Sequence, residues 1–326
     1  MEEMLNKENK ENVLTPDSHI DAAEFEWVGQ DTEKMMEIGR PSISYWNDAF
    51  NRLKRDKIAV FFIGVLLVIT LLAIIIPFVY PISGNVMHKQ HLNAGMFYSD
   101  GTCFHIFGTD SLGRDLFVRI WEGARISLTI AFVSVLVNGI IGVIYGGISG
   151  YFGGKIDDVM MRIVEIVNGI PYLLVVLLLM LVMERGVMTI IIALVAVGWV
   201  GMARLVRGQV IQLKEQEFII AAKTMGVSSS RIIAKHLVPN ILSIIIVNLT
   251  LAIPSAIFNE AFLSFIGLGV RVPLASWGTL AQDGITNFRY YPYQLLIPAF
   301  FISITMLSFN LLGDKLRDAF DPRLRR

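Results

Sequence analysis

The chain has 326 residues, of which 54% are hydrophobic and 17% are charged, and its formal net charge at pH 7 is zero. Because a soluble globular domain carries about a quarter charged residues, this composition argues against such a domain and favours a membrane protein. The single cysteine, Cys103, excludes a disulfide within the chain.

The N-terminal region divides into two parts. The first 40 residues hold 11 acidic and 4 basic residues, and they lack the apolar core of a signal peptide. This composition predicts a disordered, acidic cytoplasmic tail over 1–41. In 42–57, Ile43, Trp46, Phe50 and Leu53 recur at near-helical spacing and basic residues follow them. We therefore expect an amphipathic helix that lies flat in the membrane interface.

Long uncharged runs dominate the rest of the chain. Six stretches of 17 to 23 residues contain no Asp, Glu, Lys or Arg: 58–78, 126–148, 166–183, 187–203, 237–258 and 293–313. A helix that crosses a bilayer needs about 17–25 apolar residues, so the sequence predicts an all-α membrane protein with six transmembrane helices in a domain over 58–313. A buried soluble helix is the alternative for the shortest run. Pro171 and Pro254 are expected to break the third and fifth spans.

The basic residues are distributed unevenly between the two sides of these spans. With the N-terminus in the cytoplasm, 21 of the 28 lysines and arginines fall on the cytoplasmic side. This bias agrees with the positive-inside rule and predicts that both termini are cytoplasmic. It also predicts outer segments at 81–118 and 260–292, and a cytoplasmic tail at 314–326. The basic clusters adjoin membrane ends, which favours contact with the lipid bilayer over nucleic-acid binding.

The first outer segment contains three histidines and a predicted helix start. His88, His91 and His105 match no standard spacing of metal ligands, so no metal site is expected. Asp110 or Ser111 is suited to cap a helix that begins near Leu112. Trp121 would then lie at the outer membrane interface.

Small and polar residues interrupt the apolar spans. Gly142, Gly146 and Gly150 share one helical face and predict close packing against another helix. Four asparagines either bond neighbouring helices or line a wet pathway; they are Asn138, Asn168, Asn248 and Asn259. In the second outer segment, Glu260 and Asp283 are expected to meet solvent, a partner or a charged substrate. The sequence around Gly154 and Lys155 lacks the complete phosphate-binding pattern, so we expect no ATP binding by this chain.

A short polar stretch at 218–240 separates two apolar runs. A helix containing Ala221 and Ala222 should end at Gly226, since glycine tolerates the left-handed conformation that closes a helix. Ser228 to Ser230 are then suited to cap a second short helix before Pro239. We place this coupling region at 215–235, where paired helices at the membrane face would transmit movement from a soluble partner.

Four signatures occur in order along the chain. They are Gly108-Thr109-Asp110 with Leu112-Gly113-Arg114-Asp115, Ala221-Ala222 with Gly226, Gly267-Leu268-Gly269 with Ser276-Trp277-Gly278, and Gly313-Asp314 with Leu316-Arg317-Asp318. Together they resemble the inner-membrane permease subunits of bacterial ABC importers for dipeptides, oligopeptides and nickel. The likeness covers about 46–324 and is strongest to the second, C-type subunit.

This resemblance implies the type I ABC importer permease fold in the bacterial cytoplasmic membrane. It also implies a cytoplasmic coupling helix that docks on an ATP-hydrolysing subunit. The matching positions are Ala221, Ala222, Gly226 and Pro239, whereas Ile220, His236 and Val238 depart from the family pattern. Ile220 stands at the acidic position of the family, and the missing acid leaves the docking surface more apolar. Glu217, which lies three residues earlier, is the candidate substitute for the missing acid. The residues expected to couple to the ATPase are Glu217, Ala221, Ala222, Lys223, Gly226, Val227 and Arg231.

The family also implies the partners and the mechanism. The expected partners are a second homologous permease subunit, two ATPase subunits and an external substrate-binding protein. ATP and Mg would bind to the ATPase subunits, so this chain is expected to be neither an enzyme nor a holder of cofactors. Peptides would cross by alternating access.

Two alternatives remain. Nickel or another small solute is the first, although nickel systems are a minority of this family. A self-sufficient secondary transporter is the second, but such proteins usually carry acids within the membrane for ion coupling, and the six uncharged cores have none.

Overall fold

The computed structural model describes residues 45–101 and 103–321, and the tail predicted over 1–41 lies outside them. From Ala49 onward the described residues form one compact unit. Two helices open the described part, α3 (Tyr45–Arg55) and α4 (Lys57–Val79). Asp56 separates them, and its carboxylate accepts hydrogen bonds from the backbone N–H groups of Ile58 and Ala59. This cap starts α4 as a new helix.

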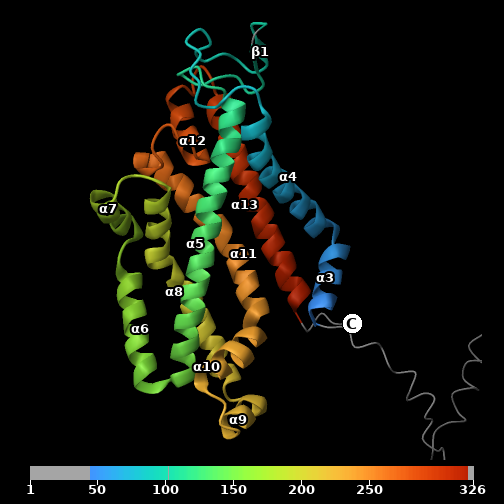
Figure 1. The fold of residues 1–326 in the computed structure, drawn as a ribbon, viewed down its shortest axis with the longest axis vertical. Coiled ribbons are helices and arrows are strands. Elements are labelled where there is room, and N and C mark those ends of the chain that lie inside the picture. The colour runs from blue at the N-terminus through green and yellow to red at the C-terminus, as the bar shows by residue number, and fades with distance from the viewer. Residues whose placement is uncertain (1–44, 102, 322–326) are drawn as a thin grey trace, which may run out of the picture. The chain divides into compact units, whose positions relative to one another are not determined.

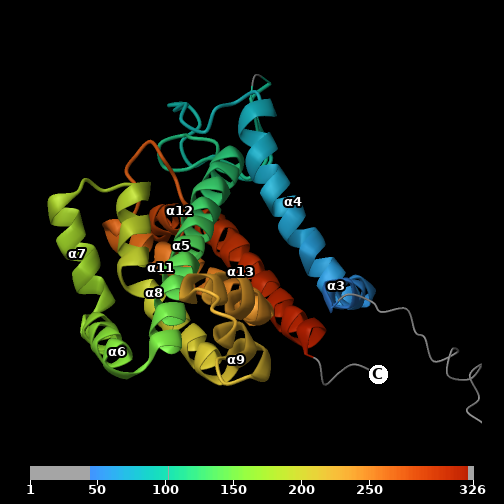
Figure 2. The ribbon, with the colours of Figure 1, turned by 60° about the horizontal axis from the view of Figure 1, so that its bottom comes forward.

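Five helical segments are long and apolar enough to cross a membrane. Three of them are α4, α5 (Leu116–Phe152) and α8 (Val187–Leu213). The fourth runs through α10 (Ser229–Arg231), η2 (Ile232–Leu237), α11 (Val238–Leu263) and η3 (Ser264–Leu268), and the backbone leaves the helical conformation at Gly267 (φ 85°). The fifth is α13 (Tyr293–Phe320). In both views α5, α8, α11 and α13 lie between α4 on one flank and the α6–α7 pair on the other (Figures 1 and 2).

The sixth candidate span is a bent pair, α6 (Gly154–Gly169) and α7 (Tyr172–Val182), which together are long and apolar enough and have 81° between the two helices. Ile170 is extended at φ −82° and ψ 121° because the following Pro171 disfavours the helical conformation before it. The expected break at Pro171 is therefore confirmed. The break expected at Pro254 is wrong, since α11 continues through that residue.

The closest helix pairing joins α5 to α8 through the predicted glycine face. A Cβ atom on Gly142 would lie 2.5 Å from Cβ of Met202, and one on Gly150 would lie 2.8 Å from the carbonyl oxygen of Arg207. At Gly146 an added Cβ would overlap the carbonyl oxygen of Ala203. These glycines let two backbones approach more closely than any side chain permits.

Replacing Gly146 by alanine should therefore destabilise the protein by about 1–3 kcal/mol, the usual cost of overpacking a filled interface. The thermal unfolding midpoint in detergent measures this effect. Gly208→Ala is the matched control, because a Cβ on this α8 glycine meets nothing within 4 Å. Equal midpoints for the two variants would contradict the packing role of Gly146.

The segment between α4 and α5 folds into a compact cap. Strands β1 (Tyr98–Ser99) and β2 (Phe104–His105) pair antiparallel, with Tyr98 opposite His105. His91 and His105 contact each other (Nδ1 to Nε2, 3.2 Å), and each also contacts an aspartate at 2.7 Å, Asp100 and Asp115 respectively. Within the described ranges, no group of three or more His, Cys, Asp or Glu side chains is arranged to hold a metal ion.

The predicted start of the next helix is wrong by four residues. Helix α5 begins at Leu116 and is capped by Asp115, whose carboxylate accepts from the N–H of Val118 at 2.9 Å. Asp110 instead accepts hydrogen bonds within the preceding turn. Trp121 is also not at an interface, because it is 4% exposed and packs inside the protein against Phe301.

The second predicted outer loop, 260–292, contains more helix than expected. Helix α11 extends to Leu263, and α12 (Trp277–Thr286) follows with a capping box at Ser276. Glu260, expected in contact with solvent, a partner or substrate, is instead fully buried in α11. Ser127 and Ser264 donate hydrogen bonds to its two carboxylate oxygens at 2.8 and 2.7 Å. Helix α13 likewise runs past Gly313 to Phe320, so the predicted tail at 314–326 is mostly helical where described.

Candidate functional site

The predicted coupling region forms a helix and a tight turn at one end of the bundle. Helix α9 (Glu217–Thr224) lies at the opposite end from β1 (Figure 1). Gly226 has φ +77°, as its expected helix-ending role requires. The N–H of Val227 donates to the carbonyl of Ala222 at 3.1 Å, and the N–H of Gly226 donates to that of Lys223 at 3.0 Å. These two bonds form a Schellman motif, which favours glycine at the left-handed position.

The second helix differs from the prediction. Ser228 occupies the capping position before α10, but its side chain makes no capping hydrogen bond. After three residues α10 passes through η2 into α11, so the expected separate short helix is the first turn of a long one. Pro239 lies at the start of α11, directly after the π-helical turn η2. Because proline has no backbone N–H, it cannot donate the usual helical hydrogen bond to the preceding turn.

The side chains of α9 divide into an inner and an outer face. Ile219 and Ala222 are buried, and Val227 packs against the same apolar cluster as Ile219. Phe218 is 45% exposed, Ile220 53% and Met225 76%. The exposed face of α9, with Met225 directly after it, therefore presents three large apolar side chains beside the exposed Glu217 and Lys223, and such apolar exposure is a feature of protein-binding surfaces.

The seven residues predicted to couple fall on both faces. Glu217, Ala221, Lys223, Gly226 and Arg231 are exposed and available to a partner. Ala222 is buried and Val227 half-buried, so these two hold α9 against the bundle and do not themselves form a docking surface.

A polar clamp beside α9 joins three helices. Nε and Nη2 of Arg207 on α8 donate to the two carboxylate oxygens of Asp157 on α6, each at 2.5 Å. Ser149 on α5 donates to the same carboxylate. Lys214, which follows α8, donates from Nζ to the carbonyl of Gly150 at 3.0 Å. The bidentate arginine fixes the ends of α5, α6 and α8 to one another.

A second feature is a cavity of about 420 Å³ between α5, α7, α8 and α11. Asn138, Asn248 and Asn259 line this cavity, and Asn168 does not, since it is exposed on α6. Sequence reasoning missed Ser134 and Tyr172, which also line it. Ser134 precedes Asn138 by four residues and shares its helical face, so the signal was present. Tyr172 gave no such signal.

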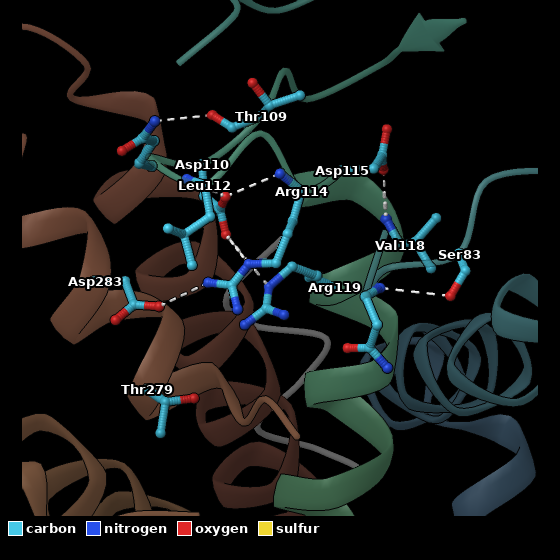
Figure 3. A network of polar contacts seen from close by, with 12 residues as sticks. Ser83, Thr109, Asp110, Leu112, Arg114, Asp115, Val118, Arg119, Thr279 and Asp283 are labelled. Carbon is cyan, nitrogen blue, oxygen red and sulfur yellow. Dashed lines mark hydrogen bonds and ion pairs between the residues drawn. The ribbon is translucent and has the colours of Figure 1, made fainter. Parts of the chain in front are cut away.

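A third feature is the Asp110 network at the β1 end, which consists of Asp110, Arg114, Arg119 and Asp283 (Figure 3). Nε of Arg114 donates to Oδ2 of Asp110 at 2.6 Å, and Nε of Arg119 lies 3.7 Å from the same oxygen. Asp283 on α12 lies 3.5 Å from Nη2 of Arg114. Both arginines are buried, so the first sequence signature joins α5 to α12 through charge pairs.

Comparison with known proteins identifies the family. The model of the binding-protein-dependent transport system inner membrane component matches residues 141–326. The model of the N-terminal transmembrane domain of oligopeptide transport permease C matches residues 44–95. A solved structure titled as inward-facing conformations of the MetNI methionine ABC transporter is 21% identical, with a TM-score of 0.47, and it covers 63% of this chain and 96% of its own.

Curated relatives match nearly the full length. The chain is 50% identical over 317 residues to the dipeptide transport system permease protein DppC of Bacillus subtilis (95% of this chain, 97% of the relative). It is 49% identical over 296 residues to the oligopeptide transport system permease protein OppC of the same organism (91% and 94%). OppC of Escherichia coli K12 is 42% identical over 294 residues (90% and 95%). The chain is thus an integral membrane protein that belongs to the family of binding-protein-dependent transport system inner membrane components, the permeases of ABC importers.

Proposed function

We propose that this chain is one of two permease subunits in an importer that carries dipeptides or oligopeptides across the bacterial cytoplasmic membrane. The observation that carries the proposal is 49–50% sequence identity to peptide permeases over more than 90% of the chain. The apolar exposed face of α9 supports it, because that face offers a soluble ATPase subunit a surface to engage. The complete importer would also contain a second permease, two ATPase subunits and an external binding protein.

Transport follows from how these parts connect. Closure of the ATPase subunits on ATP would move α9, and the clamp of Asp157, Arg207 and Ser149 would pass that movement to α5, α6 and α8. The cavity would then open alternately to either side. ATP and Mg stay on the ATPase subunits, and this chain supplies the pathway.

The deciding experiment is uptake by proteoliposomes that contain the complete importer. We expect labelled peptides to accumulate only when this chain, its partner permease, the ATPases, the binding protein and ATP are all present. The isolated chain should hydrolyse no ATP. Accumulation of ⁶³Ni²⁺ without peptide uptake would replace the peptide assignment, and peptide uptake by the isolated chain would favour a secondary transporter.

Both termini and α9 are proposed to face the cytoplasm, because basic residues concentrate on that side. Single cysteines at Gln216, before α9, and at Tyr290, after α12, should react with membrane-impermeant reagents from opposite sides. Both native residues are exposed, and Cys103→Ser removes the background thiol. Reaction of both cysteines from the outside of intact cells would overturn this topology.

A further inference from the structure

The cavity between α5, α7, α8 and α11 has neutral walls. Its polar lining residues are Ser134, Asn138, Tyr172, Asn248, Ser255 and Asn259. No acidic, basic or histidine side chain of the described chain is among the residues that line it. Its volume of about 420 Å³ falls within the range of about 300–1,000 Å³ that small-ligand sites occupy.

Three polar atoms in this lining are buried and have no hydrogen-bond partner within the described protein. They are Oγ of Ser134, Oδ1 of Asn138 and the hydroxyl of Tyr172. Asn248 differs, because its Nδ2 donates to the carbonyl of Ile244 on its own helix at 3.0 Å. A buried polar group without a partner is unfavourable, so the three groups require water or a ligand to complete them.

A glycine on α8 makes room for the asparagine. An added Cβ on Gly198 would overlap Nδ2 of Asn138. Among the described residues, that Nδ2 reaches only the carbonyl of Leu194, at 3.5 Å. Asn138 therefore lines the cavity with a buried carbonyl oxygen that has no hydrogen-bond donor within the described protein.

These groups match one peptide unit. The oxygen of Asn138 accepts from a backbone N–H, and the hydroxyls of Ser134 and Tyr172 donate to a backbone carbonyl. Every amino-acid residue except proline offers this pair of groups, so the site would accept peptides irrespective of their side chains. A transition-metal ion prefers imidazole, thiolate or carboxylate ligands, which this lining lacks.

We propose that Ser134, Asn138 and Tyr172 form a binding site for the backbone of the passing peptide, an inference that rests on the proposed peptide transport. Between transport cycles, water molecules form the hydrogen bonds of these three groups. A peptide unit can replace the water without a loss of hydrogen bonds, because it makes the same ones. The site reads the main chain and leaves side-chain selection to the binding protein.

The test uses the complete importer in proteoliposomes with two probes, trialanine and trialanine methylated on its central amide nitrogen. Uptake is compared at equal occupancy of the binding protein, which is measured separately for each probe. We expect the wild-type importer to carry the methylated peptide about three- to tenfold more slowly, the factor that one neutral hydrogen bond provides. Asn138→Leu should abolish this discrimination.

Two conservative variants test the hydroxyls. Tyr172→Phe and Ser134→Ala should each slow trialanine uptake about three- to tenfold. Thr305→Val is the control, because Thr305 also has a buried hydroxyl without a partner but lies on α13 outside the cavity lining. It should leave uptake unchanged at matched protein levels.

The outcomes separate the site from the function. Absence of peptide uptake by the wild-type importer would overturn the proposed function and the site with it. If the wild-type importer takes up peptides normally, the site alone is overturned by two results together. These are wild-type transport rates for Tyr172→Phe and Ser134→Ala, and slower uptake of the methylated peptide that persists in Asn138→Leu. Tyr172→Phe preserves the shape of the side chain, so its result does not depend on refolding of the cavity.

Discussion

Replacing Asp110 by alanine should destabilise the protein by about 3–5 kcal/mol, the usual cost of removing one partner from a buried ion pair. Asp110 accepts from Nε of Arg114 at 2.6 Å and from the backbone N–H groups of Leu112 and Arg114 at 2.9 and 3.0 Å. Arg114 is 3% exposed and Arg119 is 2% exposed. Without Asp110, two guanidinium groups would stay buried with one carboxylate fewer between them.

Asp283→Ala is the matched control for this prediction. Its carboxylate is 49% exposed and lies 3.5 Å from Arg114. Burial raises the pKa of the Asp283 carboxyl, and the nearby Arg119 and Arg114 oppose that rise. We expect a loss of about 1 kcal/mol or less, because the Asp283 carboxylate is half exposed to water and lies at a long distance from Arg114. Thermal unfolding of the purified protein in detergent gives both values, and equal losses would show that Asp110 is not the centre of the network.

The spans were predictable because apolar length and missing charge are directly visible in a sequence. Each of the six uncharged runs corresponds to a long helix or to the bent α6–α7 pair. Pro171 also predicted the break between α6 and α7, since the residue before a proline avoids the helical conformation. The continuity of α11 through Pro254 was not predictable, because neighbouring packing decides whether a proline ends a helix.

Buried charges were the main failure of sequence reasoning. Glu260 and Arg114 belong to the predicted outer segments, although both lie inside the protein. The partner of Glu260 on α5, Ser127, is 133 positions away in the chain. Such a pairing exists only after α5, α11 and α12 have packed together, and no local pattern encodes it.

The coupling region contains one correct and one wrong prediction within ten residues. Gly226 was predictable because a left-handed helix end favours one residue type. The second helix was misjudged because Ser228 to Ser230 are good capping residues by type, whereas the chain after them continues into the long helix that reaches Leu263. Propensity indicated where a helix starts but not how far it extends.

Replacing Gly226 by valine should abolish transport while leaving the bundle folded. The residue has φ +77°, and a Cβ there would meet nothing within 4 Å in the described part of the chain. The cost is therefore backbone strain of about 1–2 kcal/mol, without a steric clash. That strain energy is small compared with the packing energy of the whole bundle. It weakens, however, the two hydrogen bonds that hold the turn after α9. We expect α9 to lose its fixed orientation, and with it the docking surface for the ATPase.

Two further variants make this prediction specific to the coupling element. Gly226→Asn should retain transport, because asparagine tolerates the left-handed conformation better than other side chains. Ala221→Asp should abolish it by another route, since Ala221 is exposed and a carboxylate would stand among Phe218, Ile220 and Met225 on the docking face. Peptide uptake and substrate-stimulated ATP hydrolysis are compared in proteoliposomes at matched levels of assembled importer. Near-normal values for both Gly226→Val and Ala221→Asp would mean that movement reaches the spans by a route other than α9.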